Sequence, residues 1–310
     1  MHVSDRPLRP QSMPGGAPRS SRGSRWALAC LAMLALPALA DIEFRPQFAG
    51  QFGEGQGADA TFLQIDSGWR GSQVLWDESI RAYGQGTPIS EFGWGTGLWG
   101  LSDWALVQQA AAAPAPGLPP IIGQWSGLQG SISFGNTAFN TAENETPRWG
   151  TVALAPIFTA PARQPAQVNE DNWTAHVQGY IRVTEAGVYN FSVLNDDGFF
   201  LALTGEGGRQ LRIERDHLNY PERLGFADNL YLSPGLYGFD LGMFNRIEAG
   251  VVDLRWVTPG NADWTLVPTS SLLSVSAVPE PASGLLLLVG GALLLAGQRR
   301  RVAAAGVPRR

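Results

Sequence analysis

Short segments in which apolar and polar residues alternate run through the second half of the chain, and this period of two is typical of half-buried β-strands. The clearest case is the segment 187–196, whose apolar face is formed by Tyr189, Phe191 and Val193. The same alternation recurs over 237–243 and 251–256. Strands with one apolar face must cover that face with a second sheet. The sequence therefore predicts an all-β fold, a two-sheet antiparallel β-sandwich.

Helical and linker patterns divide the rest of the chain. Only residues 102–113 have the pattern of an amphipathic helix, and the Ala- and Pro-rich residues that follow are typical of a linker. We therefore predict three parts between the two ends of the chain: a Trp- and Gly-rich N-terminal segment of unknown role at 41–109, a linker at 110–126 and the β-sandwich at 127–277.

The first 40 residues predict export. Five arginines precede an apolar run over 26–36, and the small-residue pattern Ala-Leu-Ala follows at 38–40. This is the layout of a Sec-type secretory signal peptide that is cleaved before Asp41. The only cysteine, Cys30, lies inside the apolar run, so we expect the mature chain to have no disulfide and no thiolate site.

Residues 278–310 combine a short motif, an apolar segment and a basic cluster. The motif consists of Val278, Pro279, Glu280 and Pro281, and the cluster of Arg299, Arg300 and Arg301. As a helix the apolar part would reach about 24 Å, which makes it a short transmembrane helix with its basic end in the cytoplasm.

This order of motif, helix and arginines resembles the PEP-CTERM sorting signal of Gram-negative bacteria that make exopolysaccharide. The resemblance implies that a sorting protease, an exosortase, recognises the tail. It also implies anchoring in the membrane before processing, and delivery to the cell surface or the extracellular matrix. A permanent C-terminal membrane anchor is the alternative.

Net charge narrows the range of partners. Between Asp41 and Ala277 the chain has 25 acidic residues against 12 arginines, and it has no lysine, so this part has a net charge of about −13. Nucleic-acid binding needs a basic surface, and anionic lipid would repel such a protein. We therefore expect no nucleic-acid partner, whereas neutral sugars and divalent cations remain suitable.

The residues Asn195, Asp196, Asp197 and Gly198 supply turn chemistry between two apolar strands. Two adjacent carboxylates at a strand end repel each other unless a cation or hydrogen-bond donors lie between them. This turn is therefore the best candidate for a ligand site in the chain.

Several stretches together resemble one known family. They are GLQGSISFGNTAFN (127–140), NWTAHVQGYIRV (172–183), GVYNFSVLNDDGFFLAL (187–203), LSPGLYGFDLGMFNRIEAGVVDLRW (232–256) and VPTSSLLS (267–274). The chain from residue 127 onward is similar to the PA-fourteen domain. This is the protective-antigen-type, lectin-like β-sandwich found in yeast flocculins, epithelial adhesins and glycosidase-associated modules. The Asp-Asp-Gly hairpin and the paired C-terminal strands are its most specific features.

The resemblance implies a calcium site. In lectin-like members the paired aspartates bind Ca2+ across a cis peptide, and these match Asp196 and Asp197. By the same match Asn245 is the third side-chain ligand, and Ile247 and Ala249 offer backbone carbonyls. Carboxylate, amide and carbonyl oxygens are the ligands that calcium prefers. Vicinal sugar hydroxyls would complete the coordination, so Asp196, Asp197 and Asn245 are also the predicted carbohydrate-binding residues. The alternative is that the acid pair serves only as hairpin chemistry.

The sequence thus predicts a surface protein that binds carbohydrate or exopolysaccharide. A structural matrix protein without a specific ligand is one alternative. An enzyme is less favoured, because the common catalytic motifs are missing, although Asp77, Glu78, Glu91 and Asp103 are available. Trp173 and Trp256 are predicted core residues, whereas the roles of Trp94 and Trp99 stay open. The stretch 205–229 is interpreted as a solvated excursion, with a binding groove as the alternative.

Overall fold

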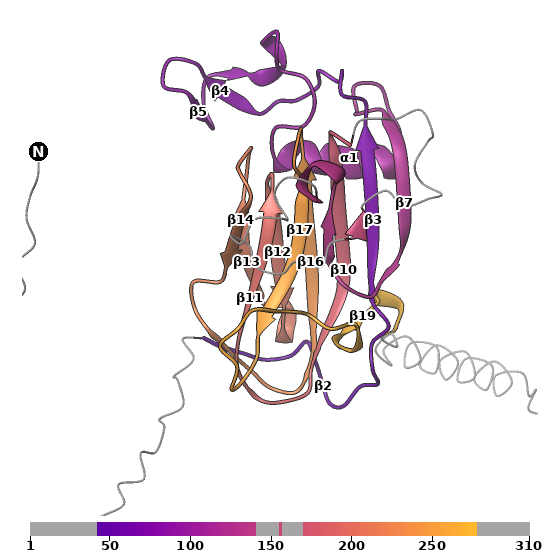
Figure 1. Cartoon of the computed structure of the whole chain (residues 1–310), viewed down its shortest axis with the longest axis vertical. Coiled ribbons are helices and arrows are strands. Elements are labelled where there is room, and N and C mark those ends of the chain that lie inside the picture. Colours follow the sequence, from indigo (N-terminus) through magenta and orange to yellow (C-terminus); the bar gives the residue numbers. More distant parts are fainter. Residues whose placement is uncertain (1–41, 141–154, 157–169, 278–310) are drawn as a thin grey trace, which may run out of the picture. The chain divides into compact units, whose positions relative to one another are not determined.

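The computed structural model describes residues 42–140, 155–156 and 170–277 (Figure 1). Within these residues the chain is mostly β-strand, and the helix α1 spans Leu101–Ala112. The predicted signal peptide and the predicted sorting signal lie outside them. No helix in this part of the chain is long and apolar enough to cross a membrane.

The first sheet has eight strands. Its order is β1 (Ile42–Phe44), β15 (Leu230–Leu232), β11 (Gly187–Asp196), β17 (Val251–Val257), β8 (Ser133–Gly135) and β9 (Ala155–Pro156). In addition, β14 (Glu222–Gly225) pairs with β11, and β18 (Thr265–Leu266) pairs with β17. The pairs are antiparallel except for β1 with β15 and β8 with β9.

The second sheet also has eight strands, and all its pairs are antiparallel. Its order is β13 (Gln210–Arg215), β12 (Phe199–Thr204), β16 (Gly235–Asn245), β10 (Trp173–Val183), β3 (Ala58–Ile65) and β7 (Ile121–Gln129). Two short strands complete it, β19 (Leu272–Leu273) beside β10 and β2 (Phe48–Ala49) beside β16.

Along the chain, a small three-stranded sheet and several 3-10 turns are inserted among the strands of the two large sheets. The small sheet has the order β5 (Ala82–Tyr83), β4 (Leu75–Asp77) and β6 (Thr87–Pro88). In Figure 1 its strands β4 and β5 lie beyond the upper ends of the long strands. The 3-10 turns are η1 (Ile89–Glu91), η4 (Glu206–Gly208), η5 (Thr269–Ser271) and η6 (Val275–Ala277).

One hydrophobic core joins the two large sheets. Its members from the first sheet include the predicted face Tyr189, Phe191 and Val193, and those from the second include Tyr237, Phe239, Leu241 and Met243. Each such side chain stabilises the fold by about 1.5–3 kcal/mol when it is fully buried. Trp173 is 0% exposed and Trp256 is 8% exposed, so both are core residues as predicted. The prediction of two antiparallel sheets is therefore confirmed.

The segments 187–203 and 232–256 are predicted as hairpins, but in each of them the chain crosses from one sheet to the other. β11 lies in the first sheet while β12 lies in the second, and β16 and β17 are divided in the same way. Both strands of each pair still send their apolar faces into the shared core. The alternation of residues is the same whether two strands lie side by side or face each other across a core, which is why the pairing was predicted wrongly.

The predicted boundary at residue 127 is also wrong. The strand β3 lies between β10 and β7 in the second sheet, and its residues Ala58, Ala60 and Phe62 belong to the core. The predicted linker at 110–126 instead contains the end of α1 and the first part of β7. Small alanine side chains give a weak alternation, so the strand was hidden within the Trp- and Gly-rich segment.

The stretch 205–229 is likewise not a solvated excursion, because it contains β13 and β14. β13 continues the second sheet at its edge, and β14 pairs with residues 192–195 of β11. The predicted helix at 102–113 is confirmed as α1, shifted by one residue.

Candidate functional site

Strands of both sheets end together at one end of the sandwich. In the second sheet Trp173, the first residue of β10, pairs with Asn245, the last residue of β16. In the first sheet Asp196, the last residue of β11, pairs with Val251, the first residue of β17. The connections from β11 to β12 and from β16 to β17 therefore lie side by side.

The acid pair sits in the first of these connections and is nearly buried. The peptide bond between Asp196 and Asp197 is cis, as the family resemblance implied, and each residue is only 6% exposed. The next residue, Gly198, has to be a glycine because the backbone there passes close to neighbouring atoms. A Cβ atom at this position would lie 2.6 Å from Cε1 of Phe244 and 2.7 Å from the carbonyl oxygen of Arg215.

Backbone N–H groups hold the carboxylate of Asp197. Its Oδ1 accepts a hydrogen bond from the N–H of Asn219 at 3.2 Å, and its Oδ2 accepts one from the N–H of Arg246 at 2.8 Å. The side chain of Asn219 donates to Oδ1 of Asn195 at 3.2 Å. The Oδ1 atom of Asn219 is buried and has no hydrogen-bond partner among the described residues. A buried acceptor beside the acid pair is thus open to a donor or a cation.

The surroundings of the pair change the acidity of several groups. Burial raises the pKa of Asp197 to about 7, although the N–H groups of Arg246 and Asn219 act in the opposite direction. Burial, and then the charge of Asp197, raise the pKa of Tyr83 to about 12. Burial lowers the pKa of Arg246, while the charge of Asp197 opposes that change. A cation beside the pair would favour the ionised carboxylate.

The connection after β16 brings three further polar groups together. One end of the side-chain amide of Asn245 lies 3.2 Å from the carbonyl oxygens of both Ile247 and Ala249. With its nitrogen at that end, the amide donates to both carbonyls, and its oxygen accepts from the indole N–H of Trp173 at 3.1 Å. With its oxygen at that end, three oxygens face one another, which is the arrangement that a cation stabilises.

Buried contacts fix the shape of this loop. Asn136 accepts from the N–H of Gly250 at 3.0 Å and donates to the carbonyl oxygen of Glu248 at 2.5 Å. Asp171 accepts from the N–H of Glu248 at 3.2 Å. Gly250 is required by packing, since a Cβ atom there would lie 2.7 Å from Cγ of Asn245. The polar groups of the loop are therefore held in place from outside it.

These residues fit calcium. The set consists of two carboxylates, an amide oxygen and two carbonyl oxygens, all of them hard ligands. Each oxygen of Asp197 accepts one N–H, and the side chain of Asp196 lies within hydrogen-bond reach of Asp197. No group of three or more His, Cys, Asp or Glu residues in the described part of the chain is arranged to hold a metal ion. Oxygen ligands of these mixed kinds would suit calcium better than metals that prefer nitrogen or sulfur.

Arg246 joins the acid pair to the N-terminal segment. Its backbone N–H holds Asp197, while its guanidinium donates to the carbonyl oxygens of Thr96 and Trp94, each at 3.2 Å. The guanidinium also lies 3.9 Å from the ring centroid of Trp99, a cation–π contact. The Trp- and Gly-rich segment therefore lies against the candidate site.

A second contact joins the N-terminal segment to the loops around the acid pair. The ring of Tyr83, in β5, stacks on that of His217, with centroids 4.4 Å apart and an angle of 16°. His217 lies in the connection between β13 and β14, two residues before Asn219. Two loops that flank the acid pair are thus in contact with the N-terminal segment.

Three of the four acids that are available to an enzyme are hydrogen-bonded to nearby residues. Each accepts hydrogen bonds from neighbours: Asp77 from Ser79, Glu78 from the indole of Trp76, and Asp103 from Ser72 and from the N–H of Trp99. These contacts do not bring the three side chains together around one space.

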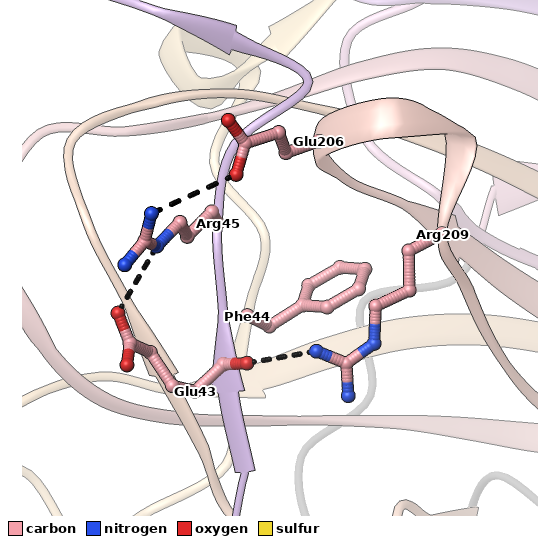
Figure 2. Close-up of a pocket in the computed structure, with 5 residues that line it drawn as sticks. All are labelled: Glu43, Phe44, Arg45, Glu206 and Arg209. Atoms are coloured by element: carbon pink, nitrogen blue, oxygen red, sulfur yellow. Dashed lines mark hydrogen bonds and ion pairs between the residues drawn. The ribbon is translucent and has the colours of Figure 1, made fainter.

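A separate hollow of about 280 Å³ lies between β1 and η4 (Figure 2). Arg45 lies 3.2 Å from Glu43 and 3.9 Å from Glu206, and Arg209 donates to the carbonyl oxygen of Glu43 at 3.0 Å. Arg45 pairs with both glutamates, and the guanidinium of Arg209 lies 5.5 Å from the ring centroid of Phe44. The two positive and two negative side chains balance, so the hollow has little net charge to offer a ligand.

The sequence did not single out three residues that shape the site. Asn136 and Asn219 lie in polar stretches between strands, where asparagine is common in any turn. Arg246 follows Asn245 directly, but neither its backbone contact to Asp197 nor its contact to Trp99 has a signal in the sequence. Only the three-dimensional arrangement shows these roles.

No protein-family model matches the chain, and no curated protein matches its sequence. Similar solved structures include PA-fourteen domains, adhesin domains and anti-sigma factor domain-containing proteins. The PA-fourteen domain of the antifreeze protein MpAFP is 14% identical, with 75% of this chain and 98% of that chain covered and a TM-score of 0.40. The PA-fourteen sugar-binding domain from an RTX adhesin is 13% identical, with 71% and 99% covered and a TM-score of 0.39.

The A domain of epithelial adhesin 6 from Candida glabrata, in complex with Galb1-3GlcNAc, is 14% identical. The match covers 75% of this chain and 92% of that chain, with a TM-score of 0.43. At these identities and TM-scores the similarity does not say what this chain binds.

Proposed function

We propose that this chain is an exported cell-surface or extracellular-matrix protein whose β-sandwich binds carbohydrate or exopolysaccharide in a calcium-dependent manner. The observation that carries the proposal is the meeting of two nearly buried carboxylates, Asp196 and Asp197, with the loop of Asn245, Ile247 and Ala249. The two carboxylates lie side by side in one nearly buried turn, and a cation there would offset the repulsion between their charges.

The chain's own residues would fix where the oxygens lie. The side chains of Asp196, Asp197 and Asn245 and the carbonyls of Ile247 and Ala249 would hold Ca2+. When bound, calcium supplies positive charge and open coordination positions for vicinal hydroxyl groups. The N–H groups that hold Asp197 and the Asn136 contacts that hold the loop keep these oxygens in position before any ligand arrives.

Binding is favoured over catalysis by the position of the carboxylates. A glycoside hydrolase places two carboxyl groups on opposite sides of the scissile bond. Asp196 and Asp197 are adjacent in the chain and share one turn, which suits a shared ion. The export and sorting parts of the proposal rest on the sequence alone: the signal at 1–40, and the motif, apolar segment and arginines within 278–310.

A glycan array tests this function. The purified protein is applied in calcium, and again after calcium has been removed with a chelator. We expect binding to neutral glycans in calcium only, and we expect Asp196→Asn to lose it while keeping its circular dichroism spectrum. Binding that is unchanged by chelation would contradict the calcium requirement. A folded protein that binds no glycan in calcium would favour the structural matrix protein instead.

A further inference from the structure

We propose that Trp94, in the Trp- and Gly-rich segment, forms a second sugar subsite beside the acid pair. The subsite would bind the next ring of a neutral oligosaccharide whose first unit is bound at Asp196 and Asp197. This inference rests on the proposed function and gives the segment 41–109 a role in it. The ligand class is then a glycan of at least two units, rather than a single sugar.

Trp94 is held rigidly by other aromatic rings. Its ring is stacked on that of Phe92, with centroids 5.1 Å apart, and lies 5.0 Å from that of Trp99. The ring of Trp76 packs edge-on at 6.2 Å. A side chain fixed in this way loses little conformational freedom when a ligand binds to it.

Despite these contacts Trp94 is 45% exposed. Eight large hydrophobic side chains are exposed among the described residues, and five of them lie on the small sheet or on loops near the acid pair. These five are Leu75, Ile80, Trp94, Tyr220 and Ile247. Tyr220 and Ile247 directly follow the residues whose N–H groups bind Asp197, and Trp94 accepts from Arg246, so these three flank the acid pair. Exposed apolar side chains beside a polar site indicate a binding surface.

Arg246 sets the distance between this surface and the acid pair. Its backbone N–H donates to Asp197, and the far end of its side chain donates to the carbonyl oxygen of Trp94. One arginine side chain therefore spans the distance from Asp197 to the backbone of Trp94. A disaccharide can bridge a gap of this kind, with vicinal hydroxyls at one end and a ring face at the other.

The chemistry of the surface selects its occupant. The apolar C–H face of a pyranose packs on an indole ring, while the hydroxyls at its edge stay in water. The guanidinium of Arg246 is already engaged by Trp99 and by two carbonyl oxygens. Because the part between Asp41 and Ala277 has a net charge of about −13, anionic sugars are disfavoured.

The test compares glycans of different lengths. An array presents galactose, glucose, mannose and N-acetylglucosamine, each as the monosaccharide and as its β-linked disaccharides and trisaccharides, in the presence of calcium. We expect the wild type to bind the longer glycans of one series more tightly than the monosaccharide. Trp94→Ala should lose that gain, roughly tenfold in affinity, and keep the monosaccharide signal. Trp94→Phe should retain most of the gain, because it keeps an aromatic ring.

Tyr231→Ala is the matched control. Tyr231 is an aromatic residue that is 41% exposed, and it pairs with Val188 at the end of β11 that is far from Asp196. This variant should bind like the wild type. Equal losses for monosaccharide and longer glycans in Trp94→Ala, or no loss for either, would overturn the subsite while leaving calcium-dependent binding in place. A wild type that binds no glycan would overturn the proposed function and the subsite with it.

Discussion

Asp103 gives the most direct test of the energetics of the N-terminal segment. It lies in the first turn of α1 and is 0% exposed. Its Oδ2 accepts from Oγ of Ser72 and from the N–H of Trp99, each at 2.8 Å, whereas its Oδ1 has no hydrogen-bond partner among the described residues. Burial raises its pKa from 3.8 to about 6, although both hydrogen bonds act in the opposite direction.

A carboxyl group whose pKa is raised in the folded state binds its proton more tightly there than in the unfolded chain. The free energy of unfolding therefore falls as the pH rises through the interval between about 4 and 6, and the loss is complete above about pH 7. The rise from 3.8 to about 6 corresponds to about 3 kcal/mol. Asp103→Asn does not titrate, so relative to the wild type it should gain about this much stability between pH 4 and pH 8.

Urea denaturation of both proteins at a series of pH values measures this difference, since pH effects from the other groups cancel. Ser72→Ala is a useful second variant. It removes a donor that favours the charged carboxylate, so it should destabilise the protein more at pH 8 than at pH 4. Parallel stability curves for the wild type and Asp103→Asn would refute the reasoning, because Asp103 would then titrate alike in the folded and unfolded states.

A buried ion pair, a core tryptophan and the two ends of the chain can each be tested. Asp253→Ala should cost roughly 3–5 kcal/mol in urea denaturation, because it leaves the largely buried guanidinium of Arg223 without its 2.6 Å partner. Trp256→Ala should cost a similar amount, about 3–5 kcal/mol, since it empties part of the core; a loss below 1 kcal/mol would mean that this strand face is not packed. The melting temperature of the mature protein should not respond to reductant, and a response would show that Cys30 is retained. Removal of residues 299–301 should leave the tail unprocessed in cells, and normal trimming on an immunoblot would contradict the sorting signal.

The sequence predicts which residues of a strand face the core better than it predicts which strands pair with each other. The alternation around Phe191 and Leu254 identified core faces correctly, because burial on one side fixes the period of two. The turn at Asp197 and Gly198 reads as a hairpin, but nothing in the alternation says whether the next strand lies beside the first or across the core. The strand β3 was missed for a different reason, since its small alanines carry little hydrophobic signal.

The residues of the site could be predicted only where a sequence motif identifies them. The acid pair and the loop of Asn245 came from the family resemblance, and the structure places them together. The contacts of Asn219 and Arg246 to Asp197 use backbone N–H groups, which every residue has. The part played by Trp94 and Trp99 depends on how distant segments pack. Such contacts leave no trace in residue spacing, which is why the N-terminal segment had no predicted role.

A calcium titration followed by thermal melting tests the central claim most directly. The chelator-treated wild type should gain about 2.7 kcal/mol at a hundredfold excess of calcium over its dissociation constant, which is roughly 5–10 °C in melting temperature. Asp196→Asn and Asp197→Asn should lose most of this shift, and Asn245→Ala should lose less because it removes one neutral ligand. Trp256→Ala should melt lower and keep the full shift. If the wild type shows no calcium-dependent shift while its near-ultraviolet circular dichroism is that of a folded protein, the acid pair is turn chemistry and the chain has no calcium site there.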